Sequence, residues 1–173
     1  MHLVLLGYMG SGKSSTGQLL ASITNRNFQD LDNVIATSEG MTISELFKRK
    51  GEIYFRNMEV EVLNDLLQHD EPIMIATGGG TPCYGRVMDE LDKNENAITV
   101  YLKTSLEVLT QRLFPERHNR PLIAHLETEV ALKDFIRKHL FERSFYYNQA
   151  DIVVDCDERN PKEIVEQILL ELF

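Results

Sequence analysis

Gly7-Tyr8-Met9-Gly10-Ser11-Gly12-Lys13-Ser14 begins seven residues into the chain and matches the phosphate-binding pattern G-x-x-x-x-G-K-[ST] at every fixed position. The apolar run before it, residues 2–6, predicts a buried strand, and apolar residues at helical spacing follow it up to Ile23. In this context a polyphosphate lies on backbone N–H groups at a helix N-terminus. The residues expected to contact it are Gly10, Ser11, Gly12, Lys13, Ser14 and Ser15.

Two side chains of this loop have expected roles of their own. Lys13 is expected to reach the β and γ phosphates, and the Ser14 hydroxyl is expected to hold Mg²⁺. The alternative is a glycine-rich turn with an exposed lysine. The flanking strand and helix favour the phosphate site over that alternative.

Composition places the chain among globular proteins. Its 173 residues, 43% hydrophobic and 26% charged, are typical of one domain, and no apolar run approaches the length of a membrane span. The predicted first strand follows Met1 directly, so we expect no signal peptide. Cys83 and Cys156 lack metal-ligand spacing, which favours reduced thiols in the cytoplasm.

The charge balance limits the partners that we expect. Eighteen basic and 27 acidic residues give a net charge of −9, whereas a nucleic-acid-binding protein usually presents a basic surface. We therefore expect no nucleic-acid partner, no membrane partner and a monomer. An acidic protein that binds a polyphosphate must gather its cations locally, so the positions of the arginines become informative.

Predicted strands and helices alternate along the chain. Helix-start signals, in which Thr or Asn precedes Glu by three residues, occur at Thr42, Thr104 and Asn160. The alternation predicts a three-layer α/β/α fold, with a parallel sheet covered on both faces, over residues 1–173. The five predicted strands are 2–6, 28–32, 73–76, 97–102 and 151–154.

Three polar or glycine-rich segments follow predicted strands. They are the Gly7 loop, the pair Asp30 and Asp32, and the run 78–80. Ligands of open parallel sheets bind beyond the carboxyl ends of the strands, so all three segments should share one edge. If the second strand extends to residue 32, both aspartates point to the same side.

Six motifs follow one another along the chain. They are the P-loop (residues 7–14), Asp30-x-Asp32, Phe55-Arg56, Gly78-Gly79-Gly80, Arg120-Pro121-Leu122 and Arg143-x-x-x-Tyr147. Taken in order, these motifs resemble the shikimate kinase family, and the resemblance covers the chain from about Leu3 to the final helix. It implies a P-loop NTP hydrolase fold of the nucleoside-monophosphate-kinase type, with a substrate-binding helical region at about 33–60 and a lid at about 114–125. It also implies phosphorylation of the 3-hydroxyl of shikimate by ATP with Mg²⁺, giving shikimate 3-phosphate and ADP on the route to chorismate and the aromatic amino acids.

The resemblance gives the two aspartates separate roles. Asp32 corresponds to the family's substrate aspartate, which can orient the attacking hydroxyl and accept its proton. Asp30 corresponds to the acid that supports Mg²⁺. The alternatives are a helix N-cap for Asp32 and a solvated charge at a strand end for Asp30.

Arg56 and Arg143 resemble the arginines that hold the shikimate carboxylate, a task that suits the planar guanidinium. Arg56 could instead pair with Glu52 along a helix, whereas Arg143 has no acid three or four residues away. The triple glycine, Gly78, Gly79 and Gly80, resembles the segment beside the substrate, where the lack of Cβ permits close approach and unusual dihedral angles. Its alternative is a tight turn.

The nucleotide side of the resemblance rests on three further arginines. Arg120 corresponds to the lid arginine that reaches the ATP phosphates, as a catalytic group with Asp32 and Lys13; its alternative is a flexible charged loop. Arg112 resembles an adenine-stacking residue. Arg159 lies in a segment that resembles the loop lining the adenine. The alternative is that Asn160-Pro161 beside it is simply the start of a helix.

Other functions stay open on the sequence alone. A related kinase could act on gluconate or on a nucleoside monophosphate, and a nucleotide-binding regulator could use the P-loop without transferring phosphate. Two arginines favour an acceptor that carries a carboxylate, and a regulator needs no such pair.

Overall fold

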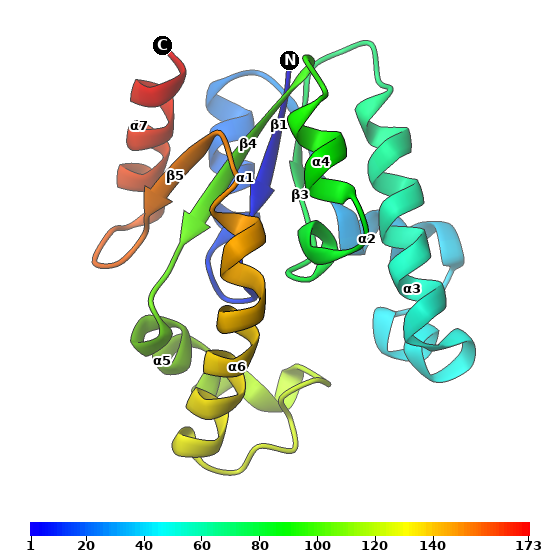
Figure 1. Cartoon of the computed structure of the whole chain (residues 1–173), viewed down its shortest axis with the longest axis vertical. Coiled ribbons are helices and arrows are strands. Elements are labelled where there is room, and N and C mark those ends of the chain that lie inside the picture. The colour runs from blue at the N-terminus through cyan, green and yellow to red at the C-terminus, as the bar shows by residue number, and fades with distance from the viewer.

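The computed structural model describes residues 1–173, and it contains a five-stranded sheet with helices on both faces (Figure 1). All paired strands are parallel, in the order β2-β3-β1-β4-β5. The predicted three-layer α/β/α architecture is therefore confirmed. The strands are β1 (His2–Leu6), β2 (Asn27–Asp30), β3 (Ile73–Ala76), β4 (Ala97–Lys103) and β5 (Ile152–Asp155).

The helices begin and end close to most of the predicted positions. Three short elements were not predicted: the helix at Val87–Asp92 and the 3₁₀ turns at Thr81–Cys83 and Arg117–Asn119. None of the helices combines the length and apolar character needed to cross a bilayer. The helical elements are α1 (Lys13–Ile23), α2 (Leu31–Glu39), α3 (Ile43–Leu67), η1 (Thr81–Cys83), α4 (Val87–Asp92), α5 (Leu106–Glu116), η2 (Arg117–Asn119), α6 (Glu129–Tyr147) and α7 (Pro161–Leu172).

The central strand β1 supplies side chains to two cores because successive residues of a strand point to opposite faces. Leu3 and Leu5 pack into the core under α1 and α7, whereas Val4 and Leu6 pack into the core under α2, α3 and α4. A third cluster packs α5 and α6 beside the phosphate loop, with Tyr8 as its loop member. This cluster attaches α5 and α6 to the phosphate loop.

The two aspartates do not lie on one extended strand. β2 ends at Asp30, whose carboxylate caps α2 by accepting a hydrogen bond from the Asn33 N–H, and Asp32 lies in the first turn of that helix. The extended geometry expected for residues 30–32 is therefore wrong, and the N-cap considered for Asp32 belongs to Asp30. Leu31 is fully buried, and this burial favours entry into the helix immediately after the strand.

The helix starts were predicted with mixed success. Capping boxes are present at Thr42 and Asn160. The box expected at Thr104 is wrong, because Ser105 is the N-cap of α5 and accepts from the Val108 N–H. β4 extends one residue beyond its predicted end, to Lys103, which moves the helix start along the chain.

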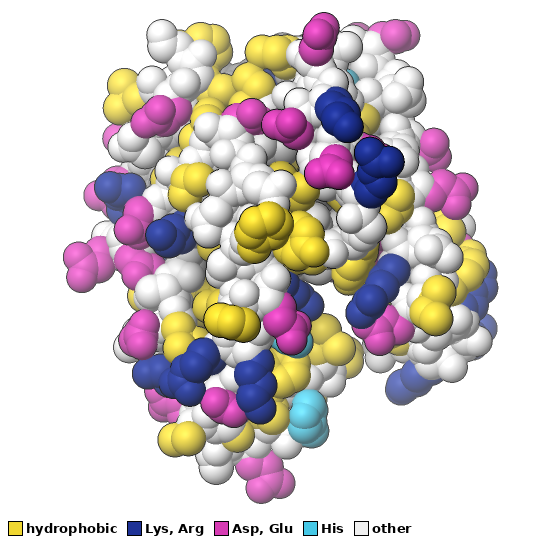
Figure 2. Space-filling view, viewed as in Figure 1, with side chains coloured by type: hydrophobic (Ala, Val, Ile, Leu, Met, Phe, Trp, Pro, Cys, Tyr) yellow, Lys and Arg dark blue, Asp and Glu magenta, His cyan; other side chains and the backbone are white.

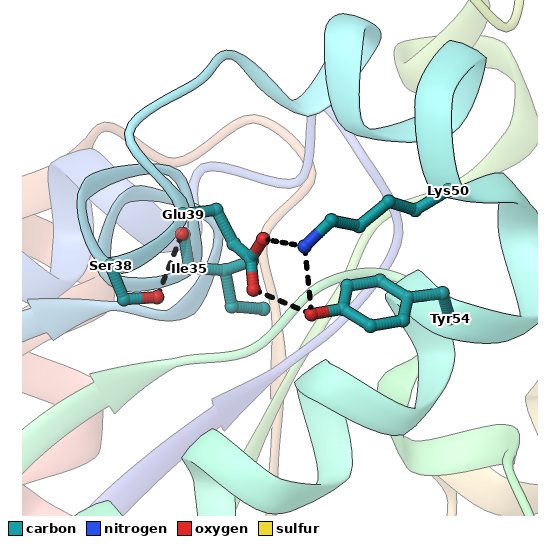
Figure 3. Close-up of polar contacts among 5 residues, drawn as sticks. All are labelled: Ile35, Ser38, Glu39, Lys50 and Tyr54. Atoms are coloured by element: carbon teal, nitrogen blue, oxygen red, sulfur yellow. Dashed lines mark hydrogen bonds and ion pairs between the residues drawn. The ribbon is translucent and has the colours of Figure 1, made fainter.

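Helix α3 is divided at Gly51, whose backbone is non-helical with φ 84° and ψ 172°. Glycine suits this position because a positive φ has little steric cost for a residue without Cβ. Figure 3 shows how Glu39 at the end of α2 joins both sides of the break. Its carboxylate lies 2.6 Å from Lys50 Nζ and accepts a 2.7 Å hydrogen bond from the Tyr54 hydroxyl.

Candidate active site

The carboxyl edge of the sheet brings the three predicted segments together. A Cβ atom built on Gly78 would lie 3.4 Å from Asp32 Oδ1, and one built on Gly79 would lie 3.4 Å from the Met9 nitrogen and 3.6 Å from the Gly7 oxygen. The expected shared edge is therefore confirmed. In Figure 2 the surface is hollowed between the side formed by α5 and α6 and the side formed by α3.

The phosphate loop has the backbone that its glycines predict. Gly10 (φ 79°) and Gly12 (φ 93°) lie in the left-handed region, and Gly12 is the N-cap of α1. The helix therefore begins at the loop, with its free N–H groups available to an anion. Ser11 is buried within the loop, and its hydroxyl has no hydrogen-bond partner.

Lys13 folds back onto the loop that carries it. Its Nζ donates hydrogen bonds to the carbonyl oxygens of Gly7, at 2.7 Å, and Tyr8, at 3.0 Å. Burial lowers the pKa of this amine to about 8, and the nearby Asp32 and Asp30 oppose that decrease. Lys13 is therefore mostly protonated at neutral pH and lies where a phosphate oxygen could replace a carbonyl as its acceptor.

Two oxygen ligands lie beside the lysine. The Ser14 hydroxyl donates a 2.8 Å hydrogen bond to Asp30 Oδ2. No cluster of three or more His, Cys, Asp or Glu residues is present to enclose a metal ion. A serine and one carboxylate nevertheless fit Mg²⁺, because this ion takes hard oxygen ligands and is commonly held by one or two protein groups with phosphates and water.

Asp32 is the most perturbed aspartate of this edge. Its Oδ1 atom is buried and has no hydrogen-bond partner. Burial, together with the charge of Asp30, raises the pKa of its carboxyl group, and Lys13 opposes the increase. The arrangement makes Asp32 a stronger proton acceptor than an exposed aspartate and leaves one oxygen free for a ligand.

Arg143 lies at the same edge without an acidic partner. It makes no ion pair; its guanidinium lies over the Tyr8 ring, 5.5 Å from the centroid, and its Nη1 would lie 3.5 Å from a Cβ on Gly79. Burial lowers the pKa of this group, but Tyr147 and Tyr8 more than offset that effect and raise it. Arg143 is thus a charged, half-buried donor that faces the junction of the phosphate loop and the glycine run.

Arg56 makes the local contact that its sequence allowed. It pairs with Glu52 one helical turn away, and both side chains are exposed. Its guanidinium also lies 4.8 Å from the centroid of the Tyr84 ring, and the Tyr84 hydroxyl lies against Gly80. The structure therefore places Arg56 beside the edge, with one aromatic ring between it and the glycine run.

The triple glycine lets neighbouring side chains approach the backbone closely, and it does not adopt unusual backbone angles. None of the three residues has a positive φ, so the expected unusual dihedral angles are wrong. A Cβ on Gly78 would overlap the Glu59 carboxylate, and one on Gly80 would overlap the Tyr84 hydroxyl. Space, and not conformation, therefore favours glycine at positions 78 and 80.

Comparison with known proteins agrees with this geometry. A model of the shikimate kinase family matches residues 9–173. The chain is 47% identical to a shikimate kinase from Flavobacterium johnsoniae over 167 residues, which are 96% of each chain.

The chain belongs to the shikimate kinase family.

Solved structures of family members have the same fold. A shikimate kinase from Bacteroides thetaiotaomicron, 32% identical, superposes with a TM-score of 0.90 and covers 99% of this chain and 98% of its own. A shikimate kinase from Acinetobacter baumannii, solved in complex with shikimate, is 31% identical with a TM-score of 0.87, over 99% of this chain and 92% of its own. The protein is therefore a kinase with the P-loop fold expected from its sequence.

The three arginines assigned to the nucleotide side of this kinase have different contacts. Arg120 forms hydrogen bonds with Glu116 at 2.8 Å and 3.1 Å, so the lid arginine is held within its own segment. Arg112 donates to the Gly10 oxygen at 3.1 Å and thus reaches the phosphate loop. Arg159 donates to the Asp155 oxygen at 2.7 Å, beside the capping box of α7.

One acidic residue of the kinase was missed by sequence reasoning. Glu59 is 1% exposed, and its Oε1 accepts a 2.6 Å hydrogen bond from the Thr81 hydroxyl. Burial raises its pKa to about 7, although the Thr81 bond opposes this, and Asp32 adds to it. The sequence feature that could have identified Glu59 is its spacing. It lies four residues from both Phe55 and Leu63, and therefore on the buried face of α3.

The contacts of three further residues at this edge were not predicted, because each joins residues far apart in the sequence. The Tyr8 hydroxyl lies 2.8 Å from His139 Nδ1. The Tyr147 hydroxyl donates a hydrogen bond to the Gly79 oxygen. No local pattern predicts such contacts, although the four-residue spacing of His139, Arg143 and Tyr147 places them on one face of α6.

Proposed function

We propose that this protein transfers the γ-phosphoryl group of ATP to the 3-hydroxyl of shikimate, giving shikimate 3-phosphate and ADP, as a step toward chorismate and the aromatic amino acids. The observation that carries the proposal is Arg143, a half-buried cation with no acidic partner between the phosphate loop and Gly79. Such a cation suits an acceptor that brings its own carboxylate. Family membership, and the shikimate bound to the Acinetobacter baumannii relative, support the same choice.

On the acceptor side, Arg143 and Arg56 hold the carboxylate of shikimate. Arg56 must leave Glu52 to do so, and an exposed ion pair of this kind contributes only about 0–1 kcal/mol. Asp32 accepts a hydrogen bond from the attacking hydroxyl and takes its proton as the new bond to phosphorus forms. Gly78, Gly79 and Gly80 let the sugar-like ring approach the backbone.

On the donor side, the amides of Gly10, Ser11, Gly12 and Ser15 hold the phosphates, and Lys13 exchanges its carbonyl partners for phosphate oxygens. Ser14 and Asp30 hold Mg²⁺, which when bound offsets the negative charge of the β and γ phosphates.

The proposal gives two segments a role. Residues 33–60 form the acceptor side, and residues 114–125 form a lid whose closure excludes water. Closure carries Arg120 from Glu116 to the transferring phosphoryl group, where its charge is needed. Arg112 and Arg159 flank the adenine on the other side of the loop.

A coupled assay of ADP release tests the proposal. Shikimate, gluconate and a panel of nucleoside monophosphates are compared at saturating Mg-ATP, and turnover is expected only with shikimate. Turnover with gluconate or a nucleoside monophosphate in place of shikimate would overturn the assignment. Binding of ATP without turnover of any acceptor would indicate a nucleotide-binding regulator.

The acceptor residues are tested in the same assay. Arg143→Ala is expected to raise the KM for shikimate by about 100-fold, since hydrogen bonds to a charged group contribute about 1.5–3 kcal/mol, with the KM for ATP nearly unchanged. A rise in the KM for ATP instead would show that Arg143 belongs to the donor side. Arg137→Ala, an exposed arginine of the same helix, is the matched control.

A further inference from the structure

One face of α6 joins the two halves of the site. His139, Arg143 and Tyr147 are four residues apart and therefore lie along the same side of the helix. His139 contacts Tyr8 of the phosphate loop, Arg143 lies over the Tyr8 ring, and Tyr147 binds the Gly79 oxygen. A single helix thus contacts the donor loop and the glycine run of the acceptor side.

Tyr8 is the loop residue at the centre of these contacts. It occupies one of the variable positions of the phosphate-binding pattern, so binding of phosphate does not require a tyrosine there. Its side chain is 1% exposed, and its ring supports the Arg143 guanidinium. The only polar atom of this buried side chain, the hydroxyl, is bonded to His139 at 2.8 Å.

The two environments allow the Tyr8 hydroxyl to donate this hydrogen bond. Burial raises the pKa of Tyr8 to about 12, so the hydroxyl keeps its proton. Burial and the charge of Arg143 lower the pKa of His139, with Glu142 opposing them, so the imidazole is neutral at pH 7 and can accept at Nδ1. The Phe135 ring, with its centroid 4.4 Å from that of His139, packs against the imidazole and limits its movement.

We propose that Tyr8 is a positioning residue for the acceptor: its hydrogen bond to His139 fixes the ring on which Arg143 rests, so the phosphate loop itself sets the position of the substrate carboxylate. The inference rests on the proposed function, in which Arg143 binds that carboxylate. No ion pair holds Arg143 in place, so the Tyr8 ring, the Tyr147 hydroxyl and the Gly79 segment determine where its guanidinium lies. The distance between the bound carboxylate and the γ-phosphoryl group is then fixed by one short chain of contacts.

Tyr8→Phe tests this role with the least change in packing, because it keeps the ring under Arg143 and removes only the hydroxyl. The KM for shikimate is expected to rise about three- to tenfold, the equivalent of one hydrogen bond. The KM for ATP is expected to stay within about twofold of wild type, since the loop backbone and Lys13 are untouched. Tyr146→Phe is the matched control, because its ring lies on the same helix and its hydroxyl makes no hydrogen bond.

A second variant approaches the same bond from the other side. His139→Leu removes the acceptor and is expected to raise the KM for shikimate at least as much, because it also leaves the buried Tyr8 hydroxyl unpaired. In the double variant with Tyr8→Phe, the rise is expected to be no larger than in His139→Leu alone, since both changes remove one interaction. Additive effects on this KM would show that the two residues act separately and would overturn the inference.

Two further results would also overturn it. One is a KM for shikimate within twofold of wild type in Tyr8→Phe, whether or not the melting temperature falls, because the hydroxyl would then be structural only. The other is an equal rise in the KM for ATP, because the hydroxyl would then serve the phosphate loop. Failure of the proposed function appears differently, as wild-type protein that does not phosphorylate shikimate or as Arg143→Ala with an unchanged KM for shikimate.

Discussion

The hydroxyl of Ser14 and the carboxylate of Asp30 are joined by a 2.8 Å hydrogen bond, although one residue lies in the first turn of α1 and the other ends β2. Two hard oxygen ligands are therefore already side by side at the phosphate loop. The same Asp30 carboxylate caps α2 through its other oxygen. The proposed Mg²⁺ ligand and the N-cap of α2 are thus the same side chain.

Asp30→Asn separates these two roles. Asparagine caps a helix about as well as aspartate, so the melting temperature is expected to change little. Loss of the charge is expected to raise the Mg²⁺ concentration required for half-maximal activity by about tenfold, the equivalent of about 1.4 kcal/mol in metal binding. A magnesium titration of activity measures this, and an unchanged requirement would contradict the role of Asp30.

The pKa of Lys13 predicts how ATP binding depends on pH. The amine is protonated below about pH 8 and loses its charge above it, so the KM for ATP is expected to be flat near pH 7 and to rise toward pH 9.5. The rise follows the loss of a cation that binds the phosphates. Steady-state kinetics across this range measure it. Lys13→Arg is the control, because arginine stays charged; a rise of the same size in that variant would assign the effect to another group.

Glu59 predicts a change of stability with pH. Its pKa is raised from 4.5 to about 7 in the folded protein, so between these values the unfolded chain is ionised while the folded protein holds the proton. Folding stability from this group is therefore lost as pH rises through that range, by up to about 3 kcal/mol at pH 8. Glu59→Gln resembles the protonated form and does not titrate.

Urea unfolding of wild type and Glu59→Gln at pH 5 and pH 8 measures this difference. The two proteins are expected to be similar at pH 5, with the glutamine variant the more stable at pH 8. Equal stability at both values would show that Glu59 ionises without cost. Glu61→Gln, on the same helix but exposed, is the control and is expected to show no such dependence.

Adjacent glycines predict opposite outcomes for the same substitution. Gly78→Ala places a methyl group on the buried Glu59 carboxylate and 2.9 Å from Thr81 Oγ1, so the melting temperature is expected to fall. Gly79→Ala meets only ordinary contacts of 3.4–3.6 Å, so stability is expected to be near wild type while the methyl group enters the space beside Arg143. The KM for shikimate is expected to rise in Gly79→Ala, and normal kinetics there would show that the acceptor does not approach this segment.

The parts of the fold that the sequence predicts best are those that depend on local pattern and parallel topology. The phosphate loop needs only its own glycines and the flanking elements, and the shared edge follows from parallel strands. Asp32 was misplaced because the end of β2 depends on the burial of Leu31, which is a tertiary contact. The helix cap predicted at Thr104 is wrong for a similar reason, since pairing with β5 extends β4 to Lys103.

The site was predicted less completely than the fold. Arg143 could be singled out because no local acid competes for it, and the structure shows no ion pair for it. Tyr8 and His139 could not, because 131 residues separate two side chains that meet only after α6 docks on the loop. Glu59 lay within reach of a pattern argument, as an acid on an apolar helix face.

The break in α3 has a consequence for how acceptor choice can change. Glu39 bonds to Lys50 before Gly51 and to Tyr54 after it, so one carboxylate links the two halves of the helix across the break. In the proposed function this helix borders the acceptor. The size of molecule admitted is then adjustable at Glu39 or Gly51, residues that touch none of the phosphate-binding groups, so new acceptors can be explored without loss of the phosphoryl-transfer chemistry.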